Sequence, residues 1–284
     1  MSIAMWIQAA RPKTIVASLC PVLIGGTLAL NEHHTHPLLF LFTLLTALGI
    51  QVSTNLANDY FDFVKGADTQ HRIGPQRITA AGLVSPATMR LAVFASFVLT
   101  ALVSIPLILQ GGAIMSLLVC LSLLLGYAYT GGPYPLAYLG LGDLFVLIFF
   151  GPCATLGTYF LQTGHASPLP ILMGLPAGLI STAILTANNL RDVESDRAAH
   201  KKTLCVRFGR TFGKWEYATA LILAIVIPCL WGYFLPLLAA PIAWLLIRNA
   251  FKAQEPTQFI SVFQTTPPFL LLHTALLIFN ILIL

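Results

Sequence analysis

The chain alternates between long apolar runs and short polar connections. The apolar runs cover residues 14–30, 38–57, 89–109, 111–130, 138–161, 168–188, 216–234, 236–249 and 267–284. An α-helix of about 20 apolar residues crosses a hydrocarbon core about 30 Å thick, and most of these runs approach that length. Turn-forming stretches such as "NEHHTH", "QGG" and "QTGHASP" separate them. The pattern predicts an all-α, polytopic membrane protein with nine transmembrane helices.

Composition supports this prediction and excludes a soluble protein. Of the 284 residues, 57% are hydrophobic and 9% are charged, whereas about a quarter of the residues in a soluble domain are charged. Because apolar runs recur along the whole length, we expect residues 1–284 to form a single transmembrane domain. The formal net charge of +5 does not indicate a nucleic-acid partner, because in membrane proteins the position of the positive charges matters more than their sum.

The positive charges indicate how the helices are oriented. With nine spans and a cytoplasmic amino terminus, all fifteen Lys and Arg residues fall on the cytoplasmic side, as the positive-inside rule requires. The same rule divides residues 216–249 into two helices near Pro236, since a single helix would place Arg248 and Lys252 outside. The amino terminus and the loops after the second, sixth and eighth spans are therefore predicted to be cytoplasmic.

Two polar clusters close apolar spans on this side. In "TNLANDYFDFVKGAD" the residues Asn55, Asn58, Asp59 and Asp62 share one helix face, and Asp68 follows just after Gly66, where we expect the helix to end. In "ANNLRDVESD" the residues Asn188, Asp192 and Asp196 recur every fourth position. Four crossings separate the two clusters, so both are predicted to reach the same membrane face, as in a weak internal repeat.

The residue types indicate a metal and diphosphate site. Carboxylates at membrane depth are costly unless a cation neutralises them, and Mg²⁺ commonly bridges protein carboxylates to phosphate oxygens. Basic side chains that could clamp a phosphate lie in the same two loops, at Lys65, Arg72, Arg77, Arg191, Arg197, Lys201, Lys202 and Arg207. The pattern suggests a lipid diphosphate whose tail lies in the bilayer. The alternative for either cluster alone is solvated loop charge.

These residues resemble the two aspartate-rich motifs of the membrane-embedded aromatic prenyltransferases, the UbiA-like superfamily. The motifs are "NDYFDFVKGAD" and "NNLRDVESDRAAHKKTLCVRFG", and further similar segments are "AARPKT", "KGADTQHRIGPQR", "YTGGPYPLAYLGLGD" and "VLIFFG". The late position of Asp68 and the "GGPYP" shortly after Tyr129 resemble the branch that prenylates 1,4-dihydroxy-2-naphthoate more than the branch that prenylates 4-hydroxybenzoate.

The resemblance implies nine helices around a central cavity that opens to the cytoplasmic side of a bacterial inner membrane. It implies transfer of a polyprenyl chain from polyprenyl diphosphate to 1,4-dihydroxy-2-naphthoate, with loss of diphosphate and CO₂, which gives demethylmenaquinol in menaquinone synthesis. Mg²⁺ is the implied cofactor, with implied ligands Asn58, Asp59, Asp62, Asp68, Asp192 and Asp196, of which Asp59, Asp62, Asp192 and Asp196 are expected to be catalytic. The implied diphosphate contacts are Lys65, Arg72, Arg77, Tyr129, Lys201 and Arg207.

Several residues and functions keep two interpretations. Each basic residue could instead set the topology, Tyr129 could be an interfacial anchor, and Asp143 could bind the aromatic acceptor or cap a helix. His200 occupies a position that is often glycine in the family, which suggests unusual backbone geometry there. The functional alternatives are a prenyltransferase for another aromatic acceptor, such as 4-hydroxybenzoate, and a membrane transporter.

Overall fold

The computed structural model describes residues 3–68, 73–74 and 77–284, and these residues form helices joined by turns. Within these described ranges, nine segments are long and apolar enough to cross a membrane. They are α2 (Pro12–Asn31), α3 (Pro37–Val64), α4 (Pro86–Val103), α5 (Ile105–Ala128), the broken segment α6–η1–α7 (Gly142–Thr163), α8 (Pro168–Arg191), α10 (Leu204–Cys229), η2–α11 (Leu235–Lys252) and α12 (Gln258–Ile283). The predicted all-α fold is confirmed, and each predicted span overlaps one of these segments.

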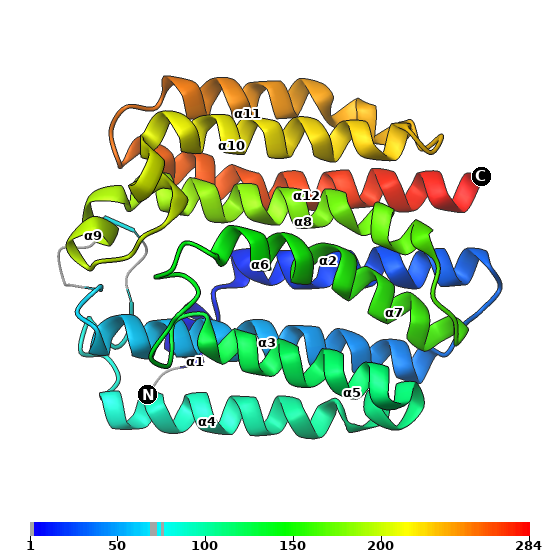
Figure 1. Ribbon diagram of the computed structural model, residues 1–284, viewed down its shortest axis with the longest axis horizontal. Coiled ribbons are helices and arrows are strands. Elements are labelled where there is room, and N and C mark those ends of the chain that lie inside the picture. The colour runs from blue at the N-terminus through cyan, green and yellow to red at the C-terminus, as the bar shows by residue number, and fades with distance from the viewer. Residues whose placement is uncertain (1–2, 69–72, 75–76) are drawn as a thin grey trace.

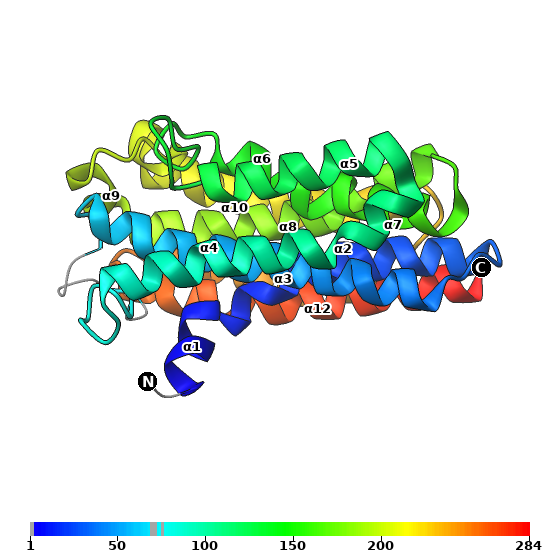
Figure 2. The same cartoon turned by 90° about the horizontal axis from the view of Figure 1, so that it is seen from below.

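The long helices lie side by side along the longest axis of the molecule (Figures 1 and 2). The amino terminus and the short helix α9 (Val193–Ala198) lie at one end, and the carboxyl terminus lies at the other (Figure 1). The short helix α1 (Ile3–Ala10) packs against α3 at the same end as α9. The bundle therefore has a polar, loop-rich end, and this end carries both acidic clusters.

Helix α8 lies at the centre of the bundle. It packs against α2, α6, α10, α12 and η1, and small residues such as Gly174, Ala177 and Gly178 are among its buried residues. Small residues let helix backbones approach closely, which matters in lipid because apolar side chains gain little by leaving it. The close packing of α8 fixes the end of the helix, where Arg191 and Asp192 lie.

The fifth span is a broken helix. It consists of α6 (Gly142–Ile148), the π-helical turn η1 (Phe149–Cys153) and α7 (Ala154–Thr163), and Gly151 in η1 has non-helical backbone angles. Pro152 cannot donate a backbone hydrogen bond, and a Cβ on Gly151 would lie 2.8 Å from the Gly174 carbonyl oxygen of α8. The break therefore occurs where two backbones meet, and π-turns of this kind are frequent at functional sites.

Several boundaries of the predicted spans differ in the structure. Helix α4 ends at Val103 rather than 109 because Pro106 lies at the start of α5, although the predicted turn at "QGG" survives as a kink at Gly112. The predicted last span began at residue 267, but Pro267 and Pro268 lie in the interior of helix α12, which begins at Gln258. The predicted division of residues 216–249 is confirmed, because α10 ends at Cys229 and α11 (Ala240–Lys252) is a separate helix.

We predict that Gly178→Ala lowers the free energy of unfolding in detergent by about 1–3 kcal/mol, because its methyl group would collide with the Leu147 carbonyl oxygen. Gly157→Ala is the control, since its methyl group would meet only the flexible end of Leu118. Denaturant titration of both variants measures the difference. Equal stability of Gly178→Ala and the parent chain would contradict the close approach of α6 to α8 at Gly178.

Candidate active site

The two acidic clusters line one cavity at the loop-rich end of the bundle. The cavity has a volume of about 690 Å³. Its lining includes residues from both clusters, and the members that were predicted as metal ligands are Asn58, Asp59, Asp62, Asp68, Asp192 and Asp196. All six are 8% exposed or less. The structure therefore places both clusters at the same end of the molecule, around one shared space, as the sequence predicted.

Both clusters end in the same helix-terminating turn. At the end of α3, Gly66 has a φ of +71°, and the amide of Ala67 donates to the carbonyl of Asp62 at 2.8 Å. At the end of α9, His200 has a φ of +57°, and the amide of Lys201 donates to the carbonyl of Asp196 at 2.8 Å. Each is the Schellman arrangement, which requires a left-handed residue. The internal repeat seen in the sequence extends to backbone geometry.

The turn at His200 directs Lys201 back into the cavity. The Lys201 Nζ lies 3.0 Å from Asp62 Oδ1 and 3.9 Å from Asp196 Oδ1, so one ammonium group bridges the two clusters. Burial alone would lower the pKa of Lys201, but the carboxylates of Asp62 and Asp196 outweigh it and raise the pKa. Lys201 is therefore charged and acts as a shared counterion for two aspartates on different helices.

Two arginines neutralise the carboxylates of Asp68 and Asp192. Arg77 Nε donates to Asp68 Oδ2 at 3.0 Å. Arg191, which is 2% exposed, donates from Nε and Nη2 to the two oxygens of Asp192, both at 2.6 Å, and from Nη2 to Asn188 Oδ1 at 2.6 Å. Such bidentate, charge-assisted pairs are strong and geometrically specific. Every basic side chain of this set lies beside an aspartate at the cavity wall.

Asp59 has a different role in the local structure. Its two carboxylate oxygens accept hydrogen bonds from the backbone amides of Ile78 and Thr79, at 3.1 and 3.0 Å. The side chain is 2% exposed, so these charge-assisted bonds form in a dry environment, where they are strongest. Asp59 therefore anchors the segment after the first cluster to α3, and this anchoring places Arg77 beside Asp68.

Tyr138 is a part of the site that the sequence did not indicate. Its hydroxyl donates to Asp62 Oδ1 at 3.0 Å, and its ring lies 5.0 Å from Lys201 Nζ and 4.7 Å from Lys65 Nζ. An aromatic face attracts cations at these distances. Tyr138 thus orders Asp62 and Lys201 together. No spacing rule linked it to the clusters, because it comes from the loop between α5 and α6.

The other predicted diphosphate contacts are distributed unevenly. Tyr129 lines the cavity, whereas Lys65 and Arg207 are not among the described residues that line it. The Lys65 Nζ donates to the carbonyl of Thr130 at 2.6 Å, and Arg207 is exposed and donates to the carbonyls of Lys202 and Leu139 at 3.0 and 2.8 Å. Arg72 lies outside the described residues. The phosphate roles of Lys65, Arg72 and Arg207 stay predictions.

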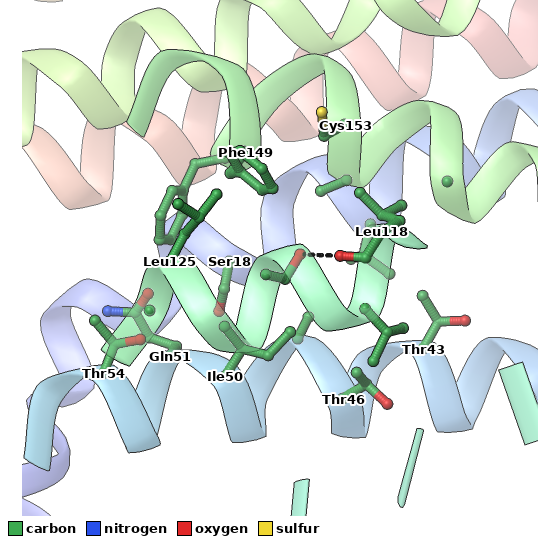
Figure 3. A pocket seen from close by; sticks show the side chains of 18 of the residues that line it. Ser18, Thr43, Thr46, Ile50, Gln51, Thr54, Leu118, Leu125, Phe149 and Cys153 are labelled. Carbon is green, nitrogen blue, oxygen red and sulfur yellow. Dashed lines mark hydrogen bonds between the residues drawn. The ribbon is translucent and has the colours of Figure 1, made fainter. Parts of the chain in front are cut away.

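A second, apolar pocket of about 150 Å³ adjoins the cavity. It lies among α2, α3, α5 and the broken fifth span, and Figure 3 shows Leu118, Leu125 and Phe149 around it. Gln51, Thr54, Tyr129, Val146 and Phe150 line both spaces. The site therefore combines a charged chamber at the end of the helices with an apolar space among their sides.

The chemistry of the donor set fits Mg²⁺. One amide oxygen and five carboxylates are hard oxygen ligands of the kind that Mg²⁺ prefers, and all line one buried cavity. Among the described residues, no group of three or more acidic, His or Cys side chains lies close enough together to hold a metal ion by itself; the amino and guanidinium groups of Lys201, Arg77 and Arg191 neutralise the carboxylates instead. A phosphate ligand would therefore have to supply part of the coordination of any Mg²⁺ bound here.

The fold and the paired acidic motifs define the class of membrane-embedded prenyltransferases. The model of the UbiA prenyltransferase family matches residues 18–279, and the chain belongs to this family. The resemblance inferred from the motifs is thereby confirmed, and the chain is an enzyme of the prenyl-transferring type.

Curated relatives match most of the chain. A protein of Escherichia coli (strain K12) named 1,4-dihydroxy-2-naphthoate octaprenyltransferase is 34% identical, over 97% of this chain and 94% of its own length. A protein of the same name from Bacillus subtilis (strain 168) is 32% identical, over 86% and 76%. The human "UbiA prenyltransferase domain-containing protein 1" is 34% identical, over 88% and 76%. The names of the two bacterial relatives agree with the branch that the sequence motifs favoured.

Solved structures share the fold. The apo structure of a UbiA homolog from Aeropyrum pernix K1 superposes with a TM-score of 0.68 at 16% identity, over 93% of this chain and 97% of that chain. A homolog from Archaeoglobus fulgidus, bound to DMAPP and Mg²⁺, superposes with a TM-score of 0.58 at 16% identity, over 98% and 99%. At these identities the likeness establishes the fold alone. What the site binds has to be inferred from its own side chains.

We predict that Asp59→Ala destabilises the metal-free protein by about 1–3 kcal/mol, because the buried amides of Ile78 and Thr79 would lose their acceptor. Denaturant unfolding in detergent with a chelator present measures this loss. Glu194→Gln is the matched control, since Glu194 is exposed and, among the described residues, pairs with Arg197 and Arg210 at 3.6 and 3.7 Å. If both variants unfold at the same denaturant concentration, Asp59 is not a structural anchor.

Proposed function

We propose that the protein transfers a polyprenyl chain from polyprenyl diphosphate to 1,4-dihydroxy-2-naphthoate, releasing diphosphate and CO₂ and forming demethylmenaquinol. The observation that carries this proposal is the single cavity into which both acidic clusters and Lys201 project, continuous in its lining with an apolar pocket. The names of the curated relatives support the choice of acceptor.

The reaction needs one site for the charged diphosphate head group and a separate site for the apolar prenyl tail. The bond between the first prenyl carbon and the diphosphate oxygen breaks, and its electron pair leaves with diphosphate. A ring carbon then supplies the electron pair of the new carbon–carbon bond, and loss of the ring carboxylate as CO₂ returns a pair to the ring. The charged cavity suits the departing anion, while the walls of the apolar pocket keep water from the allylic cation.

The basic side chains at the cavity wall are suited to receive the diphosphate. Lys201, Arg77 and Arg191 are paired with Asp62, Asp68 and Asp192. When a substrate occupies the cavity, these side chains would turn toward its phosphate oxygens, whose growing negative charge they would stabilise. Tyr129 lines both spaces, which supports a role for it where the head group and the tail would meet.

Asn58, Asp62, Asp68, Asp192 and Asp196 would hold Mg²⁺. Asp59 is also a proposed ligand, because each carboxylate oxygen that accepts an amide retains a second lone pair. When bound, Mg²⁺ supplies Lewis-acid stabilisation to the departing diphosphate. The cavity is proposed to open to the cytoplasm of a bacterial inner membrane, since the positive-inside rule places the loop-rich end there.

The identity of the products tests the proposed function. Purified protein in detergent, given Mg²⁺, polyprenyl diphosphate and 1,4-dihydroxy-2-naphthoate, is expected to yield decarboxylated prenyl naphthoquinol and pyrophosphate by mass spectrometry. A parallel incubation with 4-hydroxybenzoate should yield little product. Prenylation of 4-hydroxybenzoate alone would overturn the choice of acceptor. Recovery of both substrates unchanged would overturn the proposed prenyl-transfer reaction.

Asp192→Asn should lower turnover roughly 100-fold or more, because it removes one charge from the proposed metal and diphosphate site. The control Glu194→Gln changes an exposed carboxylate two residues away and should leave turnover within about twofold. Pyrophosphate release measures both rates, and size-exclusion chromatography checks folding. Near-parental turnover of Asp192→Asn would remove the second cluster from the site.

Removal of divalent metal should abolish turnover reversibly. A chelator is expected to bring pyrophosphate release to background, and excess Mg²⁺ should restore it, because five buried aspartates and a diphosphate repel one another without added cations. Ca²⁺ should restore less, as it prefers more ligands at longer distances than Mg²⁺. Full activity in chelator would show that the lysine and arginine side chains suffice.

A further inference from the structure

Gln51 occupies the boundary between the charged cavity and the apolar pocket. It is one of five residues that line both spaces, and it is 6% exposed. On α3 it lies on the same face as Asn55, Asn58 and Asp62, at i+4, i+7 and i+11. With a rise of 1.5 Å per residue, it lies about 10 Å deeper along the helix than Asn58.

A chain of hydrogen bonds fixes the orientation of the Gln51 amide. Thr14 Oγ1 donates to the carbonyl of Arg11 at 3.0 Å, so it can only accept from Gln51 Nε2, at 3.1 Å. Asn55 Nδ2 donates to the carbonyl of Ala10 at 2.8 Å, which leaves Asn55 Oδ1 to accept from Gln51 Nε2 at 3.4 Å. Flipping the amide would set two acceptors against each other, so Oε1 must point away from this network.

The Gln51 Oε1 atom is buried and finds no donor among the described residues. In Figure 3 the amide, which carries the nitrogen drawn in blue, turns its oxygen toward the side of the pocket near Leu125 and Phe149. A buried acceptor without a donor costs about 1–3 kcal/mol, and such groups are rare in folded proteins. An oxygen held in this way at a cavity boundary is suited to a ligand that brings its own donor.

We propose that Gln51 Oε1 accepts a hydrogen bond from a ring hydroxyl of the aromatic acceptor; this inference rests on the proposed function. A diphosphate held at the end of α3 places the first carbon of its tail deeper in the bundle, toward Gln51. The ring that attacks this carbon must therefore lie at the same boundary. Gln51 holds the ring there through its hydroxyl group.

The same hydrogen bond would assist the reaction itself. As the ring carbon forms its new bond, positive charge develops on the hydroxyl oxygen, and the O–H group becomes a stronger donor. A hydrogen bond to Gln51 Oε1 then strengthens between the bound state and the transition state, and only such interactions raise the chemical rate. Gln51 would also discriminate between acceptors, because a site that bonds a hydroxyl rejects rings that lack it.

The test is a binding cycle of two protein forms and two kinds of ring. Calorimetry measures the affinity of the purified protein, with Mg²⁺ and inorganic diphosphate, for 1,4-dihydroxy-2-naphthoate and for the two naphthoates that carry one hydroxyl. The parental chain should bind the dihydroxy acid about tenfold more tightly than one of these analogues. Gln51→Met should bind that pair with equal affinity. A role confined to the network of Thr14 and Asn55 would weaken both rings equally and keep the tenfold ratio.

Thr46→Val is the matched control. Thr46 also lies on α3, lines the apolar pocket and has a buried hydroxyl with no described partner, but it does not line the charged cavity. The Thr46→Val variant should therefore keep the tenfold preference for the dihydroxy acid over the analogue. If Gln51→Met does not fold, the affinities of the parental chain still test the inference. If it binds 1,4-dihydroxy-2-naphthoate less than twofold more tightly than each of the two monohydroxy analogues, the inference is overturned. Failure of the proposed function is distinct, since it would appear as absence of prenylated product whatever the affinities.

Discussion

Neutralisation of buried carboxylates is the constraint on which the rest of the structure depends. Five aspartates of the two clusters line one cavity at the end of an apolar bundle, and leaving such charges unpaired would be strongly destabilising. The chain meets this constraint with Lys201, Arg77 and Arg191, each within 3.0 Å of an aspartate. Because these cations belong to side chains, they can exchange partners when a substrate brings its own charge and metal.

The backbone is arranged to hold these charges in place. The Schellman turns at Gly66 and His200 terminate α3 and α9 in the same way, and in each turn the carbonyl of a cluster aspartate, Asp62 or Asp196, accepts a backbone hydrogen bond. Glycine adopts the left-handed conformation readily, whereas histidine adopts it at a cost. His200 nevertheless adopts a φ of +57° in the turn that directs Lys201 toward Asp62.

Much of this arrangement could be predicted from the sequence. Hydropathy gave the nine spans, and the positive-inside rule correctly separated α10 from α11, because both signals depend on composition averaged over many residues. The spacing correctly placed Asp62 near a helix end, whereas Asp196 lies on the separate short helix α9, after the break at Asp192. The break in the fifth span, Tyr138 and the orphaned oxygen of Gln51 could not be predicted, since each depends on which side chains meet across the bundle. Arg207, a promising residue in the sequence, is occupied by loop carbonyls.

The most direct test of the account is a structure of the protein with Mn²⁺ and a slowly reacting prenyl thiodiphosphate, in which anomalous scattering locates the metal. We predict metal peaks between the oxygens of the α3 cluster and those of Asp192 and Asp196, with the Lys201 ammonium moved from Asp62 to the diphosphate. Peaks confined to one cluster, or peaks at His33, His34 and His36 in the connection between α2 and α3, would contradict the claim that the two clusters form one site.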